Sequence, residues 1–338
     1  NLYVRRLRDN KQYGKLILGR VSNFLGNFSF YKNFLRWLDH RYMTMVEAED
    51  ILKEINPSML FLSDIYLGLD KEFVKAAQKL EIPNIGMVRS WDNVTTKGVL
   101  MGVPDLIIVH NEILRDELEQ YNNIRQEAVK VIGIPHYDVY GQSASVSRED
   151  FCRDLGLDPQ KKIILFSPGG KILYQDDLLL LKVFKDLLNK EELGDSQVLV
   201  RIPPSDDIDR GEFDNDDRFI FDVPAQSPTN ERKLSELSSN DESHLINTLY
   251  HSDVMVTLAS TIVIDAAAFD LPTVILSFNP EGAKDQIEKF SLYTHFKKLL
   301  DLDLTPVVKS ENNFAKQIQI YLADKTVDSD RSKLIIEK

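Results

Sequence analysis

Two adjacent hydroxyl residues followed by a carboxylate make the sharpest candidate binding motif in the chain. Ser260 and Thr261 open a run of small and apolar residues, and Asp265 follows about one helical turn later. Backbone N–H groups and hydroxyls at the start of a helix bind phosphate, and a carboxylate one turn further on can accept hydrogen bonds from ribose hydroxyls. We therefore predict that these residues hold a nucleoside diphosphate. The alternative is that Ser260 only caps the helix and Asp265 is a polar residue on a packed helix.

Two segments earlier in the chain offer groups for the same diphosphate. One is a glycine turn after an apolar run, where the backbone can approach a phosphate closely. Its predicted donor-binding residues are Ser167, Gly169, Gly170 and Lys171. The other is Arg201, which precedes a rigid Pro-Pro pair and can bind a phosphate bidentately. The alternatives are an ordinary glycine turn with a solvated lysine, and a surface arginine paired with the acidic residues that follow it.

A loop in the first half of the chain carries side chains suited to an acceptor. Residues 89–98 include Trp, Asp, Asn, two Thr and Lys. We predict that Asp92 is a general base on an acceptor hydroxyl, with His110 as a second candidate base. The predicted acceptor-binding residues, with the Trp as a platform for a sugar ring, are Trp91, Asn93, Lys97 and His136. The alternatives are that Asp92 only forms a turn and that both histidines are structural.

The elements that must position these residues follow an α/β pattern. Short apolar runs alternate with helical periodicity, which is typical of a parallel sheet covered by helices. Ligands of such sheets bind at the carboxyl ends of the strands, where the candidate residues stand. Residues 224–243 are polar and predict a long surface loop. The predicted strands span residues 59–62, 84–88, 106–109, 129–132, 162–166, 197–202, 218–223, 254–257 and 273–276.

A small polar segment divides this pattern into two halves. Residues 140–147, rich in Gly and Ser, predict a linker. We expect two Rossmann-like, doubly wound parallel-sheet domains, residues 1–139 and 148–325, and a tail at residues 326–338. The first domain is short of strands, so either its first 44 residues replace the missing units or those units are absent.

Charge is distributed unevenly along the chain. Residues 1–44 contain nine Lys and Arg but two Asp, whereas the whole chain has a net charge of −12. Basic residues mixed with aromatics suit an amphipathic helix on an anionic membrane, and the alternative is an ordinary core-facing helix. We expect a cytoplasmic protein, peripheral at the inner face of the membrane in the first case. The acidic total argues against a nucleic-acid partner, and a single Cys excludes a disulfide framework.

With these motifs in order, the chain resembles the GT-B glycosyltransferase superfamily. The resemblance covers about residues 55–325 and is carried by the Ser90-Trp91-Asp92-Asn93 loop, by residues 131–138 and by residues 252–275. Its relatives include CDP-glycerol glycerophosphotransferases and UDP-N-acetylglucosamine 2-epimerases. The resemblance implies two Rossmann-like domains facing across a cleft, with the donor on the second domain and the acceptor on the first. It also implies that no cofactor or bound metal is needed.

The function implied by this resemblance is group transfer. We expect a glycosyltransferase that moves a sugar from a nucleotide-sugar donor to a surface-glycan or lipid-linked acceptor, as in capsule or lipopolysaccharide synthesis. The alternatives are a polyol-phosphate transferase, a nucleotide-sugar 2-epimerase or hydrolase, and a non-catalytic scaffold on the same fold, because one fold hosts many activities.

Overall fold

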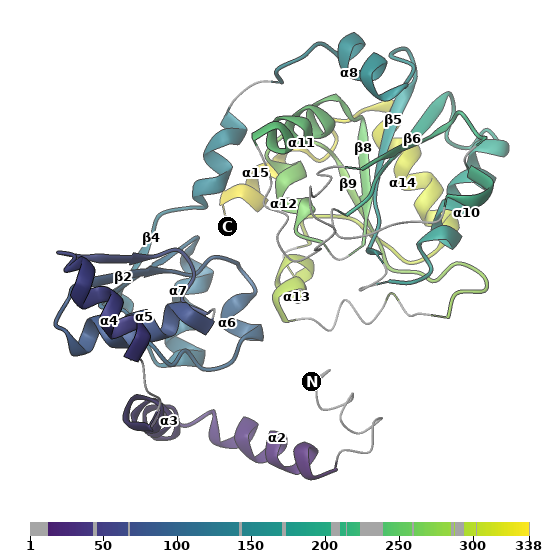
Figure 1. Cartoon of the computed structure of the whole chain (residues 1–338). Helices are drawn as coiled ribbons and strands as arrows, with labels where there is room; N and C mark the ends of the chain where they lie inside the picture. Colours follow the sequence, from purple (N-terminus) through teal and green to yellow (C-terminus); the bar gives the residue numbers. More distant parts are fainter. Residues whose placement is uncertain are drawn as a thin grey trace. The chain divides into compact units, whose positions relative to one another are not determined.

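The chain forms two α/β units that divide between Asp138 and Val139, and each is described here by itself (Figure 1). The computed structural model describes residues 13–42, 46–66, 68–141, 144–170, 174–203, 210–213, 215–223, 239–258, 260–284, 287, 294–301 and 303–337.

The first unit is built on a parallel sheet whose strands run in sequence order. The sheet consists of β1 (Leu60–Leu62), β2 (Asn84–Met87), β3 (Leu106–Val109) and β4 (Val129–Val131). Each strand pairs with the one that precedes it, so the order contains no reversal among these described strands. Alternate residues of β3 are fully buried in the core of this unit.

The helices of the first unit begin and end where local chemistry predicts. Asn111 caps α7 by accepting a hydrogen bond from the Leu114 N–H, and Asn123 ends it with a left-handed φ of 56°. No helix of the described residues is both long and apolar enough to cross a membrane. The helical elements are α2 (Tyr13–Leu25), α3 (Ser29–Tyr42), α4 (Val46–Ile55), α5 (Gly68–Lys79), α6 (Asn93–Thr96), α7 (Glu112–Asn122), and the 3₁₀ turns η1 (Gln126–Ala128) and η2 (Pro135–Gly141), the last of which crosses the boundary between the units.

The second unit contains a doubly wound sheet. Its strands stand in the order β10-β9-β8-β5-β6-β7, and every pair is parallel. The chain builds outward from β5 in one direction and from β8 in the other, so the strand order reverses between these two neighbours. The carboxyl ends at such a reversal are where doubly wound folds bind ligands. The strands are β5 (Lys162–Ser167), β6 (Ser196–Arg201), β7 (Phe219–Asp222), β8 (Val254–Thr257), β9 (Thr273–Leu276) and β10 (Val307–Val308).

Helices cover this sheet because they carry apolar faces. The ring of Phe184 on α10 lies 5.2 Å from both Phe166 of β5 and Phe314 of α14. Each such buried ring contributes about 1.5–3 kcal/mol of transfer free energy. The helical elements are α8 (Arg148–Leu155), α10 (Asp177–Asn189), η3 (Gly211–Phe213), α11 (Ser239–His251), α12 (Ile262–Ala267), α13 (Thr294–Asp301), α14 (Glu311–Ala323) and α15 (Ser329–Glu337).

Three parts of the chain differ from the expectations. Residues 239–243 begin α11 instead of belonging to a surface loop, and the rest of that predicted loop, residues 224–238, lies outside the described residues. Most of the predicted tail forms α15, which packs against α12 and so belongs to the second unit. The short strand β10 was not predicted because two residues carry no recognisable period.

Candidate functional site

The predicted ribose-binding carboxylate has a partner within the second unit. The Tyr140 hydroxyl donates a hydrogen bond to Oδ1 of Asp265 at 2.9 Å. The Tyr140 side chain is buried, and its ring meets the Phe269 ring edge to face, with 5.2 Å between the ring centres. Tyr140 lies in the predicted linker of residues 140–147, so its place in this site was not predicted from the sequence. The available signal was a bulky aromatic residue at the start of a stretch of small polar residues.

The two hydroxyl residues before α12 are not used to cap it. Thr261 occupies the N-cap position with φ −63° and ψ −22°, and within the described part of the chain its side chain makes no capping hydrogen bond. The Ser260 and Thr261 carbonyls accept from the N–H groups of Val263 and Ile264 at 3.4 and 2.9 Å. Because the Thr261 side chain is exposed, its hydroxyl is accessible to a ligand.

The glycine turn after β5 is occupied by a carboxylate of the chain itself. The N–H groups of Gly169 and Gly170 donate to the two oxygens of buried Asp177 at 3.1 and 2.8 Å. A Cβ at Gly169 would lie 2.7 Å from Leu258 Cδ1, so close packing explains that glycine. The prediction that these amides hold a phosphate is therefore corrected, because in this structure they are not open donors. They fix the start of α10 instead.

The reversal of strand order is held together by side chains at the strand ends. Ser167, the last residue of β5, pairs in register with Thr257, the last residue of β8. The Thr257 hydroxyl donates to the Ser167 carbonyl at 3.0 Å, and both side chains are buried. Ser167 therefore lies at the position where a ligand of this sheet is expected. The predicted lysine of this turn, Lys171, lies outside the described residues.

Arg201 is bound by a carboxylate of the neighbouring strand. Its Nη1 lies 2.9 Å from Oδ2 of Asp222, and the two side chains are only 9% and 6% exposed. Burial lowers the pKa of the Arg201 guanidinium, and Asp222 opposes that shift. Nε2 of His244 on α11 lies 2.9 Å from both Asp222 oxygens. Arg201 is thus buried, and its guanidinium already binds a carboxylate. A phosphate would have to share the guanidinium with Asp222.

The candidate base Asp92 is held by hydroxyl groups of its own loop. The Ser90 hydroxyl donates to Oδ1 at 2.6 Å, and the Thr96 hydroxyl lies 3.2 Å from Oδ2. The Asp92 carboxylate is half-buried at the start of α6, which follows β2. The Ser90 hydroxyl orients the carboxylate, as a general base requires, while the single proton of the Thr96 hydroxyl is shared with the Asp92 carbonyl at 2.9 Å. These bonds also fit the alternative of a structured turn.

The other predicted acceptor residues differ in accessibility. Trp91 is half-buried and Asn93 is buried, whereas Lys97 and His136 are exposed. The first three belong to the loop and helix after β2, and His136 lies in η2. Lys97 and His136 are therefore the members of this set that solvent reaches most freely.

His110 is a buried histidine whose ring nitrogens lack hydrogen-bond partners among the described residues. It follows β3, its exposed fraction is 7%, and neither Nδ1 nor Nε2 is bonded in the described part of the chain. Burial lowers the pKa of His110, so the neutral imidazole is favoured. An unsatisfied buried polar group costs stability, about 1–3 kcal/mol, and a catalytic role is one of the explanations for such a group.

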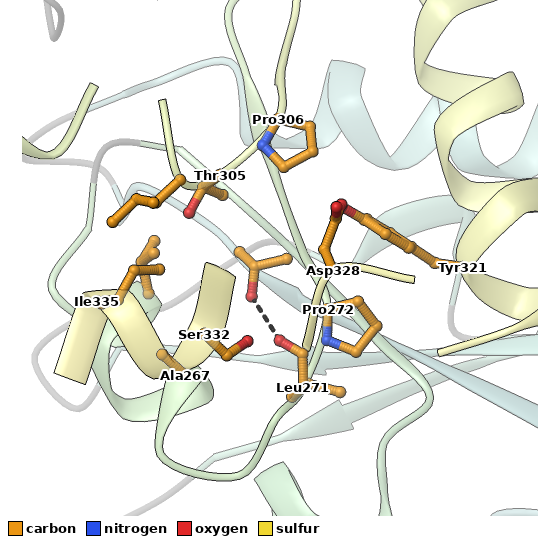
Figure 2. Close-up of a pocket in the computed structure, with 12 residues that line it drawn as sticks. Ala267, Leu271, Pro272, Thr305, Pro306, Tyr321, Asp328, Ser332 and Ile335 are labelled. Carbon is orange, nitrogen blue, oxygen red and sulfur yellow. Dashed lines mark hydrogen bonds between the residues drawn. The ribbon is translucent and has the colours of Figure 1, made fainter. Parts of the chain in front are cut away.

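The second unit contains a small cavity at the amino ends of its strands, opposite to the carboxyl ends where the candidate donor residues stand. The cavity has a volume of about 20 Å³. Pro272 and Pro306 border it, as Figure 2 shows, and they directly precede β9 and β10. It has room for about one water molecule. Its location at the amino ends of the strands separates it from the candidate donor site.

Comparison with known sequences identifies the family. A sequence model of the CDP-glycerol:poly(glycerophosphate) glycerophosphotransferase family matches residues 68–338. The chain belongs to this family. The match includes both candidate sites, from Asp92 to Asp265, and it agrees with the predicted resemblance to GT-B enzymes. No curated protein sequence matches the chain.

Solved structures place the chain in the GT-B-like fold. The S. aureus MnaA structure with UDP has a TM-score of 0.55 at 14% identity, and the alignment covers 87% of this chain and 73% of that one. The UDP-GlcNAc 2-epimerase of Methanocaldococcus jannaschii has a TM-score of 0.55 at 13% identity, with 86% and 79% covered. At these identities the likeness establishes the fold, and the family match indicates a nucleotide-activated transferase.

Proposed function

We propose that the chain transfers a polyol-phosphate unit from a CDP-activated donor to a hydroxyl of a growing polymer. The observation that carries this proposal is the family match over residues 68–338. The acceptor hydroxyl attacks the phosphorus next to the polyol, the P–O bond to the nucleotide phosphate breaks, and CMP leaves. The acceptor's proton passes to a base, and the new phosphodiester joins polyol to polymer.

Asp92 is the base in this proposal. Its carboxylate accepts a hydrogen bond of 2.6 Å from the Ser90 hydroxyl, so its lone pairs have a defined direction. A fixed base is worth more than a mobile one, because the proton must be within hydrogen-bond distance when the nucleophile attacks. His110, which is buried, is less accessible to a polymer than the half-buried Asp92.

The donor site in this proposal lies at the carboxyl edge of the second sheet. Asp265 accepts the ribose hydroxyls, and Ser260 and Thr261 bind the diphosphate. The accessible Thr261 hydroxyl and the position of α12 next to the strand reversal support this assignment. We propose that these donors offset the charge of the leaving nucleotide without a metal ion.

The released nucleotide tests the proposal directly. The protein is incubated with CDP-glycerol and a lipid-linked polyol-phosphate acceptor, and the products are separated by chromatography. Acceptor-dependent release of CMP with elongation of the acceptor is expected. A second candidate, hexosyl transfer, breaks the bond between sugar and diphosphate, so UDP-sugars would yield UDP. Conversion of UDP-N-acetylglucosamine without an acceptor would indicate an epimerase, and no turnover of any donor would favour a scaffold.

We also propose that α3 docks the protein on the membrane that carries the acceptor. Lys32 and Arg36 point into the first unit, where they donate to the carbonyls of Gln120, Leu100 and Asn122 at 3.1, 2.9 and 2.5 Å. The opposite face presents aromatic rings that are 50–68% exposed, namely Phe30, Phe34 and Trp37.

A surface helix usually turns its apolar residues to the core and its charged residues to solvent. In α3 two basic residues face the first unit and the aromatic rings face solvent. Aromatic rings of this kind are favoured at the interface between water and lipid. Exposed basic residues of the same basic stretch can contact anionic headgroups, and these are Arg41 on α3 and Lys15 and Arg20 on α2. The proposal therefore combines aromatic insertion with attraction to anionic lipid.

A further inference from the structure

The second unit contains a tyrosine–aspartate contact that bears on nucleotide selection. Tyr140 and Asp265 are 125 residues apart in sequence, yet the Tyr140 hydroxyl lies 2.9 Å from Oδ1 of Asp265. We propose that Tyr140 is a positioning residue that sets the Asp265 carboxylate for a ribose. This inference rests on the proposed function, in which Asp265 accepts the ribose hydroxyls.

The environment of Asp265 explains why it needs such a partner. It belongs to the six-residue helix α12, where Val263, Ala266 and Ala267 are buried and apolar. A carboxylate can rotate about its side-chain bonds unless a donor holds it. The Tyr140 hydroxyl is one such donor, and because a carboxylate has about four acceptor positions, the bond to tyrosine occupies only one of them.

Tyr140 itself is fixed from several sides. Its side chain is buried, and its ring packs edge to face on Phe269. The phenol is therefore held between the Phe269 ring and the candidate ribose carboxylate. A group held this firmly transmits a defined direction to the carboxylate.

If Tyr140 aims the Asp265 carboxylate, the protein should prefer nucleotides that carry ribose hydroxyls. A purely structural contact would not affect this preference. A correctly aimed carboxylate favours a ribonucleotide over an analogue without ribose hydroxyls, because the analogue leaves the acceptor unsatisfied. For a charged acceptor this preference is about 10-fold to 100-fold. Loss of the Tyr140 hydroxyl is expected to reduce the preference to about a third or less, through weaker binding of the ribonucleotide.

The experiment compares the affinities of CDP and 2′,3′-dideoxy-CDP by calorimetry for the full chain and three variants. Tyr140→Phe keeps the ring on Phe269, and Asp265→Asn removes the charge. Tyr321→Phe is the matched control, because the Tyr321 hydroxyl bonds to Asp328 elsewhere in the same unit. We expect reduced ribose preference in Tyr140→Phe, none in Asp265→Asn, and the full preference in Tyr321→Phe.

The possible failures are distinguishable. Full preference in Tyr140→Phe together with its loss in Asp265→Asn overturns the role of Tyr140 and leaves the proposed donor site intact. Equal binding of both nucleotides to the unmodified protein overturns the assignment of Asp265, and no binding of either overturns the proposed function.

Phe269→Leu covers the case in which Tyr140→Phe does not fold, because it loosens the ring but keeps the hydroxyl. Because Phe269 helps to hold the Tyr140 ring, a partial loss of the ribose preference is expected in that variant, and an unchanged preference would overturn the inference.

Discussion

Arg201 and Asp222 lie opposite each other at the carboxyl ends of neighbouring strands, β6 and β7, and form a buried ion pair 2.9 Å long. The pairing register of the strands brings them together. His244 reaches the same carboxylate from α11 and keeps 31% of its side chain exposed. Asp222 thus connects a buried cation to an accessible imidazole at the edge of the sheet where the donor is expected.

Breaking this ion pair from one side is expected to be costly. Asp222→Ala leaves the Arg201 guanidinium buried without its carboxylate, which destabilises a protein by about 3–5 kcal/mol. Arg201→Met combined with Asp222→Leu removes both charges and is expected to cost less than the single change. Urea unfolding of the two variants measures the difference. A double variant at least as unstable as Asp222→Ala would contradict this explanation.

Acid is expected to weaken the fold through His110. Burial lowers its folded pKa below the ordinary value of 6.5, so the unfolded chain binds its proton more readily. The folded state therefore has its full stability above pH 6.5 and loses stability as the pH falls below that value.

His110→Leu removes this effect together with the unsatisfied ring nitrogens. At pH 7.5 the variant is expected to unfold at an equal or higher urea concentration than the unmodified protein. At pH 5.5 the difference between the two urea midpoints is expected to be larger, with the variant the more stable. Urea midpoints across this range test the prediction. A variant that becomes more sensitive to acid would show that His110 has a stabilising partner.

Asp92→Asn tests the proposed base. Without a proton acceptor, kcat is expected to fall by about 10²–10⁴-fold, while the affinity for CDP-glycerol stays within a factor of about three. Asp116→Asn, an exposed acid on α7 of the same unit, is the matched control. If Asp92→Asn retains full turnover, the Asp92 carboxylate only shapes its loop.

The aromatic face of α3 is expected to be needed for membrane binding. Phe34→Ala with Trp37→Ala should reduce co-sedimentation with phosphatidylglycerol vesicles by about 10-fold or more, because two interfacial rings are lost. Tyr121→Ala removes an exposed aromatic ring from α7 and should bind as the unmodified protein does. Equal binding of all variants would exclude this face as the docking surface, and loss of binding in high salt alone would assign docking to charge.

Chelation tests the expectation that no metal is required. In the described residues, no three His, Cys, Asp or Glu side chains gather to hold a metal ion. Because the proposed mechanism offsets the charge of the leaving nucleotide with hydroxyl and backbone donors, CMP release is expected to continue at an unchanged rate after dialysis against EDTA. A rate that collapses and returns when Mg²⁺ is added would show that the donor binds with a metal.

Sequence periodicity located most of the sheet strands to within one or two residues. Strands of parallel sheets are often continuous apolar runs, so β3 and β8 stand out from their neighbours, although only β8 is buried along its whole length. The cap at Asn111 was equally visible, because an N-cap depends on residues three positions apart. The order of motifs also led to the correct superfamily and to the glycerophosphotransferases among its relatives, as the match over residues 68–338 confirms, whereas sugar transfer as the specific reaction is not confirmed.

The amino-acid sequence by itself determined the strands, the helix starts and the residues that stand at the strand ends. Only the tertiary structure decided which of those residues form hydrogen bonds or ion pairs with one another. Asp177 occupies the glycine amides, Asp222 binds Arg201, and Tyr140 reaches Asp265 across 125 residues. The physical reason is that secondary structure depends on neighbours within about one turn or one strand. A hydrogen bond between distant residues depends instead on strand order and packing, which no local pattern encodes.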